Sequence, residues 1–369
     1  MHRRHALSAA LAGACLLAGC APSRSQPAVN PEIRAEAQRS QGLILQAGEG
    51  ERRVRRPGPG SDAATMPFIL KVDGRNGGSA ELVMGYEEIA PGQAVQPHRH
   101  RVADEIVFVH RGSGVAEVGS RQSAVGAGAT LYIPRNTRIA LRNTGAEPLA
   151  VVSISSKPGV EQLLREGSVA EGEPAPPLSA DEQARIRARH RWHTVTEGSV
   201  PVPAKRGTGG LILQPAEGER RVRRPRPGSA VAHLGTPFIL KVDRRNGGST
   251  ELVMGYEEIA PGDAIPPHRH LHADEIVFVH RGSGLAGLGS RESAVGTGGT
   301  IYIPRDTRIT LRNTGAEPLA IVFVFSRPGF EELMRENSVL EGQPATPLSP
   351  DEQARIRARN RWHTVYDQP

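Results

Sequence analysis

Short runs in which apolar and polar residues alternate predict β-strands along most of the chain. Residues 105–109 alternate cleanly, with Glu105 and Val107 on one face and Ile106 and Phe108 on the other. Other alternating or continuously apolar runs of strand length are separated by turn residues; they cover residues 68–72, 79–89, 130–133, 138–143 and 149–154. Many short strands with regular turns predict an all-β fold.

Two helices are expected after these strands. Residues 160–165 are expected to form a shorter helix, and Ser179-Ala180-Asp181-Glu182 is a capping box that begins a longer one. This helix is expected to end near Trp192, and we expect the large side chain of Trp192 to cover one end of the strand layers.

The whole series occurs twice in the chain. Residues 67–73 recur as residues 237–243, an offset of 170 that persists to the end of the second copy. A period of this length indicates two complete domains and not a solenoid, whose repeats are far shorter. The expected division is domain 1 at residues 39–195, a linker at residues 196–209 and domain 2 at residues 210–366.

The N-terminus has the pattern of a targeting segment. A basic start precedes apolar residues 6–19, a stretch too short to cross a bilayer, which takes about 20 residues. It ends in Leu17-Ala18-Gly19-Cys20, which resembles a bacterial lipobox. The resemblance implies a signal peptide at residues 1–19, a lipid on Cys20 and a tether at residues 20–38. The alternative is an ordinary secretory peptide cleaved nearby.

Localisation and redox chemistry follow from this interpretation. Ala21, and not aspartate, follows Cys20, so we expect the periplasmic face of the outer membrane. The chain's two cysteines are Cys15 and Cys20, which leaves no thiol for a disulfide or a nucleophile in the mature domains. Because no later apolar run is long enough to span a membrane, the lipid is the only expected membrane attachment.

The formal net charge is +7, and arginine runs such as residues 52–56 and 220–224 contribute much of it. One interpretation is attraction to an anionic envelope surface. The simpler one, which we favour, is a solvated strand edge whose charges prevent pairing with other sheets. No nucleic-acid motif accompanies the charge, so no nucleic-acid partner is expected.

Candidate chemistry lies in residues 91–114, which recur as residues 261–284. His98 and His100 are two residues apart, so on a strand both imidazoles point to one face. A turn over residues 101–104 would let a second strand begin at Glu105 and run back beside the first, bringing its carboxylate to the imidazoles. Two imidazoles and one carboxylate form a ligand set that suits Fe(II) and related divalent metals.

The candidate metal ligands in the two copies are therefore His98, His100, Glu105, His268, His270 and Glu275. The alternative is a vestigial site, or histidines that are merely hydrogen-bonded inside the fold. Glu105 and Glu275 are also the candidates for a catalytic general base.

The order of Gly92, His98, His100, Glu105 and Gly112 resembles the first signature of the cupin superfamily. The second signature is matched in frame by residues 128–143 and 298–313. The resemblance implies two tandem double-stranded β-helix, or jelly-roll, barrels, each followed by short helices. It is closest to small cupin proteins likened to quercetin dioxygenase, and it implies a divalent metal cofactor: Fe(II), with Mn(II), Ni(II) or Zn(II) as alternatives.

The second signature also departs from the family pattern. Asn136 and Asp306 replace a glycine, and Ile139 and Ile309 replace the histidine that is usually the fourth ligand. His272 replaces Val102 of the first copy, so it is either a substitute ligand or, more simply, a turn residue.

The remaining histidines and two aspartates have simpler expectations. His110 and His280 are out of phase with the glutamates and are expected outside the barrels. Asp104 and Asp274 are expected to be turn residues that accept backbone hydrogen bonds. The sequence assigns no role to the two histidines near the helix ends, His193 and His363.

Three functions remain open at this point. The first is O2-dependent oxidation of a small organic substrate by a metal-binding, two-barrel lipoprotein. The second is a tethered module that binds a metal or small ligand without turnover. The third is a structural lipoprotein whose metal sites are relics.

Overall fold

The computed structural model describes residues 41–58, 66–196, 209–225 and 237–367. The predicted signal peptide, Cys20, the tether and most of the predicted linker lie outside these residues. None of the helices in the described ranges is long and apolar enough to cross a bilayer.

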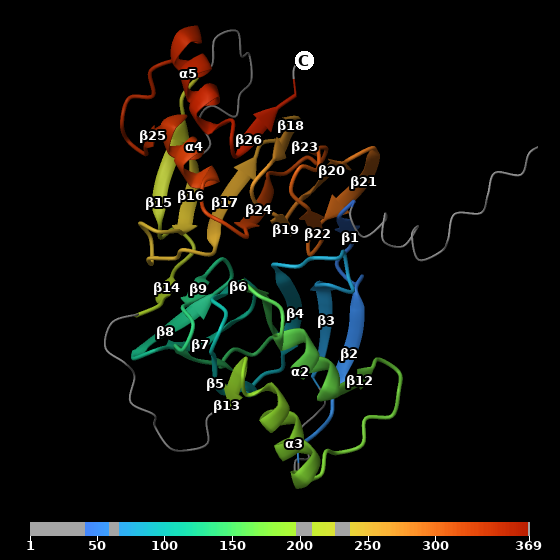
Figure 1. Cartoon of the computed structure of the whole chain (residues 1–369). Helices are drawn as coiled ribbons and strands as arrows, with labels where there is room; N and C mark the ends of the chain where they lie inside the picture. The colour runs from blue at the N-terminus through green and yellow to red at the C-terminus, as the bar shows by residue number, and fades with distance from the viewer. Residues whose placement is uncertain (1–40, 59–65, 197–208, 226–236, 368–369) are drawn as a thin grey trace, which may run out of the picture.

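The chain folds into two similar barrels, each made of one eight-stranded and one five-stranded antiparallel sheet (Figure 1). The eight-stranded sheet of the first barrel contains, in spatial order, β12 (Ser168–Ala170), β2 (Glu51–Arg55), β3 (Pro67–Val72), β4 (Val83–Ile89), β11 (Leu149–Ser155), β6 (Glu105–Arg111), β9 (Thr130–Ile133) and β14 (Leu211–Leu213). Its five-stranded sheet contains β13 (Thr194–Thr196), β5 (Ala94–His100), β10 (Arg138–Asn143), β7 (Ser113–Val118) and β8 (Arg121–Gly126).

The second barrel repeats this order. Its eight-stranded sheet contains β1 (Leu43–Leu45), β22 (Thr300–Ile303), β19 (Glu275–Arg281), β24 (Leu319–Phe325), β17 (Val253–Ile259), β16 (Pro237–Val242), β15 (Glu219–Arg223) and β25 (Ser338–Leu340). Its five-stranded sheet contains β21 (Arg291–Gly296), β20 (Ser283–Leu288), β23 (Ile309–Asn313), β18 (Ala264–His270) and β26 (Thr364–Tyr366). The predicted all-β, jelly-roll fold is confirmed.

The first strand of each repeat belongs to the other barrel. β1 pairs with β22, placing Leu43 opposite Tyr302, and β14 pairs with β9, placing Leu211 opposite Tyr132. In Figure 1 the blue strand β1 therefore lies beside β22 of the upper barrel, whereas β2, the next strand in the chain, lies in the lower barrel. This exchange ties the two barrels together through backbone hydrogen bonds.

A fully buried lysine holds the turn after each exchanged strand. Lys71 of β3 donates hydrogen bonds to the carbonyl oxygens of Gln46 and Ala47, and Lys241 of β16 binds the equivalent turn of the second repeat. These carbonyls replace the water that the ammonium group loses on burial. Burial nevertheless lowers the pKa of each lysine to about 8.

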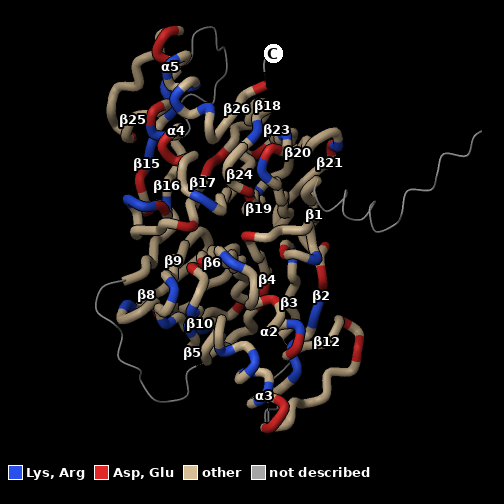
Figure 2. Tube along the Cα trace, viewed as in Figure 1, with Lys and Arg blue, Asp and Glu red and all other residues tan. Residues whose placement is uncertain are grey.

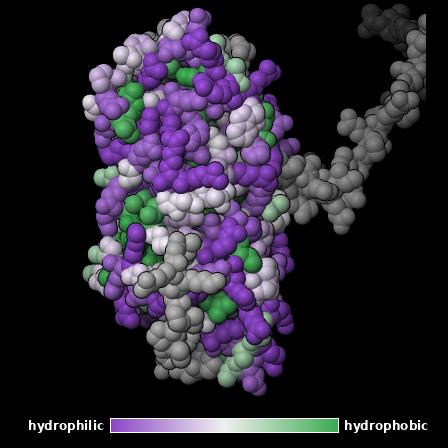
Figure 3. Space-filling view, turned by 60° about the vertical axis from the view of Figure 1, so that its left-hand side comes forward, coloured by the Kyte–Doolittle hydropathy of each residue, from purple (hydrophilic) through white to green (hydrophobic). Residues whose placement is uncertain are grey.

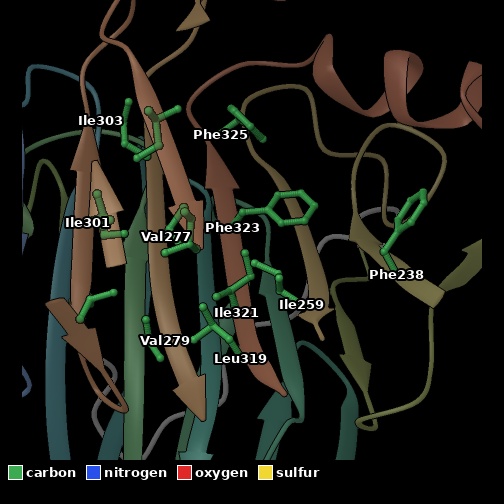
Figure 4. Packing of buried hydrophobic residues seen from close by; sticks show 14 of the residues in the cluster. Phe238, Ile259, Val277, Val279, Ile301, Ile303, Leu319, Ile321, Phe323 and Phe325 are labelled. Atoms are coloured by element: carbon green, nitrogen blue, oxygen red, sulfur yellow. The ribbon is translucent and has the colours of Figure 1, made fainter. Parts of the chain in front are cut away.

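The eight-stranded sheets are buried on both faces. The inner faces enclose one apolar core in each barrel, as Figure 4 shows for Val277, Ile301 and Phe323 of the second. The outer faces pack on each other and form a third core, which includes Phe108 and Phe278. The alternation predicted for residues 105–109 therefore separates two buried faces.

Two histidines meet in the contact between the barrels. His110 ends the outer face of β6 and His280 ends that of β19, and their Nδ1 atoms lie 3.2 Å apart. Both lie outside the barrel interiors, as predicted. Burial, His280 and Arg111 lower the pKa of His110 to about 4, so at neutral pH the pair can share a single Nδ1 proton without net charge.

The helices cover one end of each barrel. They are α2 (Val160–Glu166), α3 (Ala180–His190), α4 (Phe330–Glu336) and α5 (Pro350–Asn360). The predicted capping box is confirmed, because Ser179 Oγ accepts from the backbone of Glu182 and the Glu182 carboxylate accepts from the backbone of Ser179. The prediction for Trp192 is wrong: its side chain is 50% exposed, and the neighbouring His193 is the buried residue.

The expectation of a solvated arginine edge is also wrong. β2 lies between β12 and β3 and is not an edge strand. Arg52 pairs with Glu171, and Arg55 pairs with a glutamate inside the barrel. Arg53 donates to the carbonyl oxygens of Arg165, in the last turn of α2, and Ser168, the first residue of β12. Figure 2 shows basic and acidic positions interspersed along both barrels, and Figure 3 shows a mostly hydrophilic face with small separate apolar patches.

Candidate metal centres

The structure gathers each predicted trio at one end of its barrel interior. His98 and His100 are two residues apart on β5, and both side chains point inward, as predicted. The predicted position of the second strand is wrong, because β5 and β6 belong to different sheets. The turn over residues 101–104 carries the chain from one sheet to the facing one, so Glu105 reaches the imidazoles across the barrel interior.

The ligand atoms of each trio lie within 4.8 Å of one another. In the first barrel, His100 Nε2 lies 3.2 Å from Glu105 Oε2. In the second, His270 Nε2 lies 3.4 Å from Glu275 Oε2 and 3.0 Å from His268 Nε2. Five of the six side chains are buried, and His98 is half-buried.

Backbone carbonyls fix the tautomer of one histidine in each trio. His98 Nδ1 lies 2.8 Å from the carbonyl oxygen of Gln96, and His268 Nδ1 lies 2.8 Å from that of Pro266. A carbonyl oxygen only accepts, so in both rings Nδ1 carries the proton and the Nε2 lone pair points into the barrel. This is the tautomer that a metal ligand requires.

The remaining inward atoms fit a cation. Among the described residues, His100 Nε2 and Glu105 Oε2 are buried without a hydrogen-bond partner, although they lie close together. An unsatisfied buried polar atom is costly, by about 1–3 kcal/mol. A metal ion coordinated by both atoms would remove that cost, so the donor set fits a divalent metal.

Three of the four histidines are held neutral, as metal binding requires. Burial and the neighbouring imidazole lower the pKa of His98, and they lower that of His268 to about 4. Burial lowers the pKa of His270 to about 3. At neutral pH these rings therefore offer lone pairs and not positive charge.

The two glutamates differ in their electrostatic surroundings. Burial raises the pKa of Glu275 to about 7. At Glu105 the same burial is outweighed by His100 and His98, and the pKa lies below its usual value.

A threonine and a second histidine support each trio, and sequence reasoning missed both. Thr194 Oγ1 lies 3.1 Å from His100 Nδ1 and 2.9 Å from His193 Nδ1. With His100 Nε2 facing a metal, its Nδ1 proton is donated to Thr194, whose hydroxyl proton then goes to His193. Burial and His100 lower the pKa of His193 to about 4, so this ring is a neutral acceptor. Thr364 and His363 repeat the arrangement.

A cavity opens beside each trio, with a volume of about 340 Å³ in the first barrel and about 540 Å³ in the second. Ile139 and Ile309 line these cavities at the position of the family's fourth ligand, and Ile139 pairs directly with His98. Arg55 also lines the first cavity, where its Nε and Nη2 atoms each donate a hydrogen bond to the Glu87 carboxylate at 3.0 Å.

Two further predictions are resolved by the structure. His272 is exposed in the turn, with its ring 5.2 Å from that of Trp362, and it is not part of the trio. Its role as a substitute ligand is therefore wrong and the turn interpretation is correct. Asp104 accepts a backbone hydrogen bond from Arg135, as expected for a turn residue, and also one from the Tyr132 hydroxyl.

Thr194→Val tests the support that this side chain gives His100. Valine has nearly the volume of threonine but cannot accept the Nδ1 proton, so the ring loses its orientation. We expect zinc affinity at the first site to fall about 10- to 100-fold, as is typical for such supporting bonds. The measurement is competition with a chelator in a His268→Ala background. Thr130→Val on β9 is the control, because the Thr130 hydroxyl is buried outside the cavity and has no hydrogen-bond partner in the described chain. Equal affinities for the Thr194→Val and control proteins would contradict the role.

Comparison with known protein families and sequences agrees with the sequence pattern. The cupin domain model matches residues 85–155 and 255–325. Protein SchB of Streptomyces halstedii is 34% identical over 76 residues, which cover 21% of this chain and 55% of that protein. The tetracenomycin polyketide synthase protein TcmJ of Streptomyces glaucescens is 27% identical over 79 residues, covering 21% and 53%. The chain spans about half the length of the curated relatives it matches.

Solved structures match most of the chain. Procruciferin, an 11S globulin from Brassica napus, has a TM-score of 0.53 at 12% identity and covers 90% of this chain and 98% of its own. Oxalate decarboxylase from Lactobacillus farciminis has a TM-score of 0.51 at 14% identity and covers 78% of this chain and 86% of its own. Salicylate 1,2-dioxygenase from Pseudoaminobacter salicylatoxidans has a TM-score of 0.50 at 13% identity and covers 87% of this chain and 97% of its own. These identities show the fold alone. With the repeated sheets and the family match, they show that this chain contains two cupin domains in tandem.

Proposed function

We propose that each cupin domain binds one divalent metal ion and that the protein is a metal-dependent oxidoreductase acting with O2 on a small organic molecule. The observation that carries this proposal is the trio itself. Two imidazoles and a carboxyl group converge in each barrel, and within the described part of the chain His100 Nε2 and Glu105 Oε2 have no hydrogen-bond partner.

The ligand chemistry favours Fe(II), with Mn(II), Ni(II) and Zn(II) as alternatives, because a face of two imidazoles and one carboxylate is typical of Fe(II) oxygenases. A bound Fe(II) would supply Lewis acidity and one-electron chemistry. The apolar Ile139 and Ile309 supply no fourth protein ligand, which would leave room for a substrate oxygen and for O2.

The chain's own residues have three tasks in this proposal. The threonine–histidine pairs orient one imidazole of each trio and keep its inward lone pair available. Glu105 and Glu275 serve as ligands and are the candidates to accept a substrate proton. Apolar residues such as Val107 and Leu141 line the cavity and exclude water from it.

The names of two structural neighbours support an enzyme of this class. One is a salicylate 1,2-dioxygenase described with adducts of gentisate, and the other is an oxalate decarboxylase. Both are similar to this chain in fold alone, so the oxidation of a small organic molecule by this protein rests on the trio.

A non-catalytic binding module is the second candidate. Ile139 and Ile309 favour it, since an apolar side chain at the fourth position weakens metal binding and removes a group that a reaction could need. A purely structural lipoprotein is the least favoured, because both trios have kept their ligand types and converge.

The first prediction concerns metal content. The full chain purified with metal should hold two ions, one for each trio. His98→Ala should reduce this to one and His98→Ala with His268→Ala to none, because each remaining pair of ligands binds weakly. Elemental analysis gives the count, and His272→Ala, outside the trios, should retain both. Unchanged metal content in the double variant would contradict the proposal.

The second prediction separates enzyme from binder. The Fe(II)-loaded protein should consume O2 with at least one member of a panel of phenols and diketones, and the double histidine variant should not. An oxygen electrode makes the measurement. Full metal loading without O2 consumption across the panel would favour the binding module.

We also propose that the protein is lipid-anchored through Cys20 at the periplasmic face of the outer membrane. The lipobox-like sequence supports this; the arginine runs do not add an anionic surface partner, since Arg52, Arg53 and Arg55 have partners within the chain. Cys20→Ala should abolish incorporation of labelled palmitate and release the protein from the membrane fraction. A variant that stays membrane-bound would contradict the anchor.

A further inference from the structure

The two cavities differ in a consistent way. At the metal end they match: both are lined by a histidine of the trio, the glutamate, an isoleucine and an arginine–glutamate pair. Beyond this end, three non-aromatic lining residues of the first barrel are replaced by aromatic residues in the second. Ser153, Val160 and Thr196 of the first barrel correspond to Phe323, Phe330 and Tyr366 of the second.

The difference accounts for nearly all the asymmetry in aromatic residues between the repeats. Phe68, Tyr86, Phe108, Tyr132 and Trp192 each have an identical counterpart 170 residues later. The remaining Phe, Tyr and Trp residues have no counterpart in the first repeat, and all of them belong to the second barrel; they are Phe323, Phe325, Phe330 and Tyr366. The aromatic residues gained or lost between the copies are therefore confined to the surroundings of one site.

Three elements bring these rings together. Phe323 extends from β24, Phe330 begins α4, and Tyr366 ends β26. The centroids of the Phe323 and Phe330 rings lie 6.2 Å apart, and the Tyr366 ring lies 5.8 Å from that of the metal-ligand candidate His268. We call Phe323, Phe330 and Tyr366 the aromatic wall of the second cavity. Phe325 lies behind it, and the centroid of its ring is 4.7 Å from that of Phe330 and 4.7 Å from that of His270. Figure 4 shows Phe323 and Phe325 extending from the same strand.

The rings line the second cavity and do not fill it. If larger side chains had merely packed the barrel more densely, its cavity would be smaller than that of the first barrel. It is larger, about 540 Å³ against 340 Å³. The Phe323 ring lies over Gly255, where a Cβ would come within 2.1 Å of it, so the ring is set against the wall of the barrel.

From this geometry we propose that the second barrel is specific for a planar aromatic ligand carrying an oxygen donor, and that the first barrel is not. The ring of the ligand packs against Phe323, Phe330 and Tyr366 while its oxygen reaches the trio of His268, His270 and Glu275. Aromatic pairs attract each other beyond the burial of their area, so three aromatic side chains around the cavity discriminate against non-aromatic ligands. This inference rests on the metal binding proposed above.

The test uses catechol with the full chain loaded with zinc, which binds oxygen donors without redox turnover. Calorimetry should show catechol binding at the second site, retained in His98→Ala with His100→Ala and lost in His268→Ala with His270→Ala. cis-1,2-Cyclohexanediol, which has two oxygens but no aromatic ring, should bind at least tenfold more weakly.

A more specific test replaces residues of the aromatic wall by their counterparts in the first barrel and compares catechol affinity with that of the wild type. Phe323→Ser with Tyr366→Thr should weaken catechol binding at least tenfold while zinc content stays that of the wild type. Tyr366→Thr alone, at a half-buried position, covers the case in which the double variant does not fold and should weaken binding about threefold. Leu340→Thr, at an exposed position of the second barrel outside its cavity, is the control and should leave catechol binding unchanged.

The outcomes separate this inference from the proposed function. Protein that binds no zinc contradicts the proposed metal sites; the same catechol comparison on metal-free protein must then still distinguish the wild type from the wall variants. Two results at full zinc content would contradict the aromatic specificity while leaving the metal sites intact. One is equal catechol affinity at the two barrels, and the other is a catechol affinity within twofold of the wild type in both Phe323→Ser with Tyr366→Thr and Tyr366→Thr alone.

Discussion

Each barrel faces two imidazoles and a carboxylate toward one point of a buried cavity, and this arrangement is unfavourable unless something sits between them. The Nε2 atoms of His268 and His270 are 3.0 Å apart. The proton of His268 is on Nδ1, where it is donated to the carbonyl oxygen of Pro266. In the first barrel, His100 Nε2 and Glu105 Oε2 lie close together without an adequate hydrogen bond in the described chain. A divalent cation resolves both situations at once, and the proposed chemistry depends on it.

The surrounding fold keeps this arrangement rigid. Because the outer faces of the eight-stranded sheets pack on each other, neither barrel can open on that side without exposing Phe108 and Phe278. The exchanged strands β1 and β14 add backbone pairing between the barrels, so the two sites are parts of one body. At the end of each barrel that the helices cover, α2 and α4 border the cavities through Val160 and Phe330, one of the positions at which the two copies have diverged.

The period of two along a strand made the convergence of His98 and His100 predictable, and the family spacing made Glu105 predictable as their partner. The sheet to which Glu105 belongs was not predictable, because a turn looks the same locally whether the chain returns beside its last strand or crosses to the facing sheet. The exchange of β1 and β14 is hidden for a related reason: both strands read Leu-Ile-Leu, so either fits either barrel. Thr194 and His193 contribute through contacts distant in sequence from His100, which leave no periodic signal.

The most direct test of the central claim is X-ray absorption spectroscopy at the zinc edge of the zinc-loaded full chain. Coordination by each trio predicts two imidazoles and at least one oxygen ligand per zinc, with nitrogen at about 2.0–2.1 Å and no sulfur. A spectrum with no imidazole scattering, or with fewer than two imidazoles per ion, would show that zinc binds elsewhere and would contradict the account.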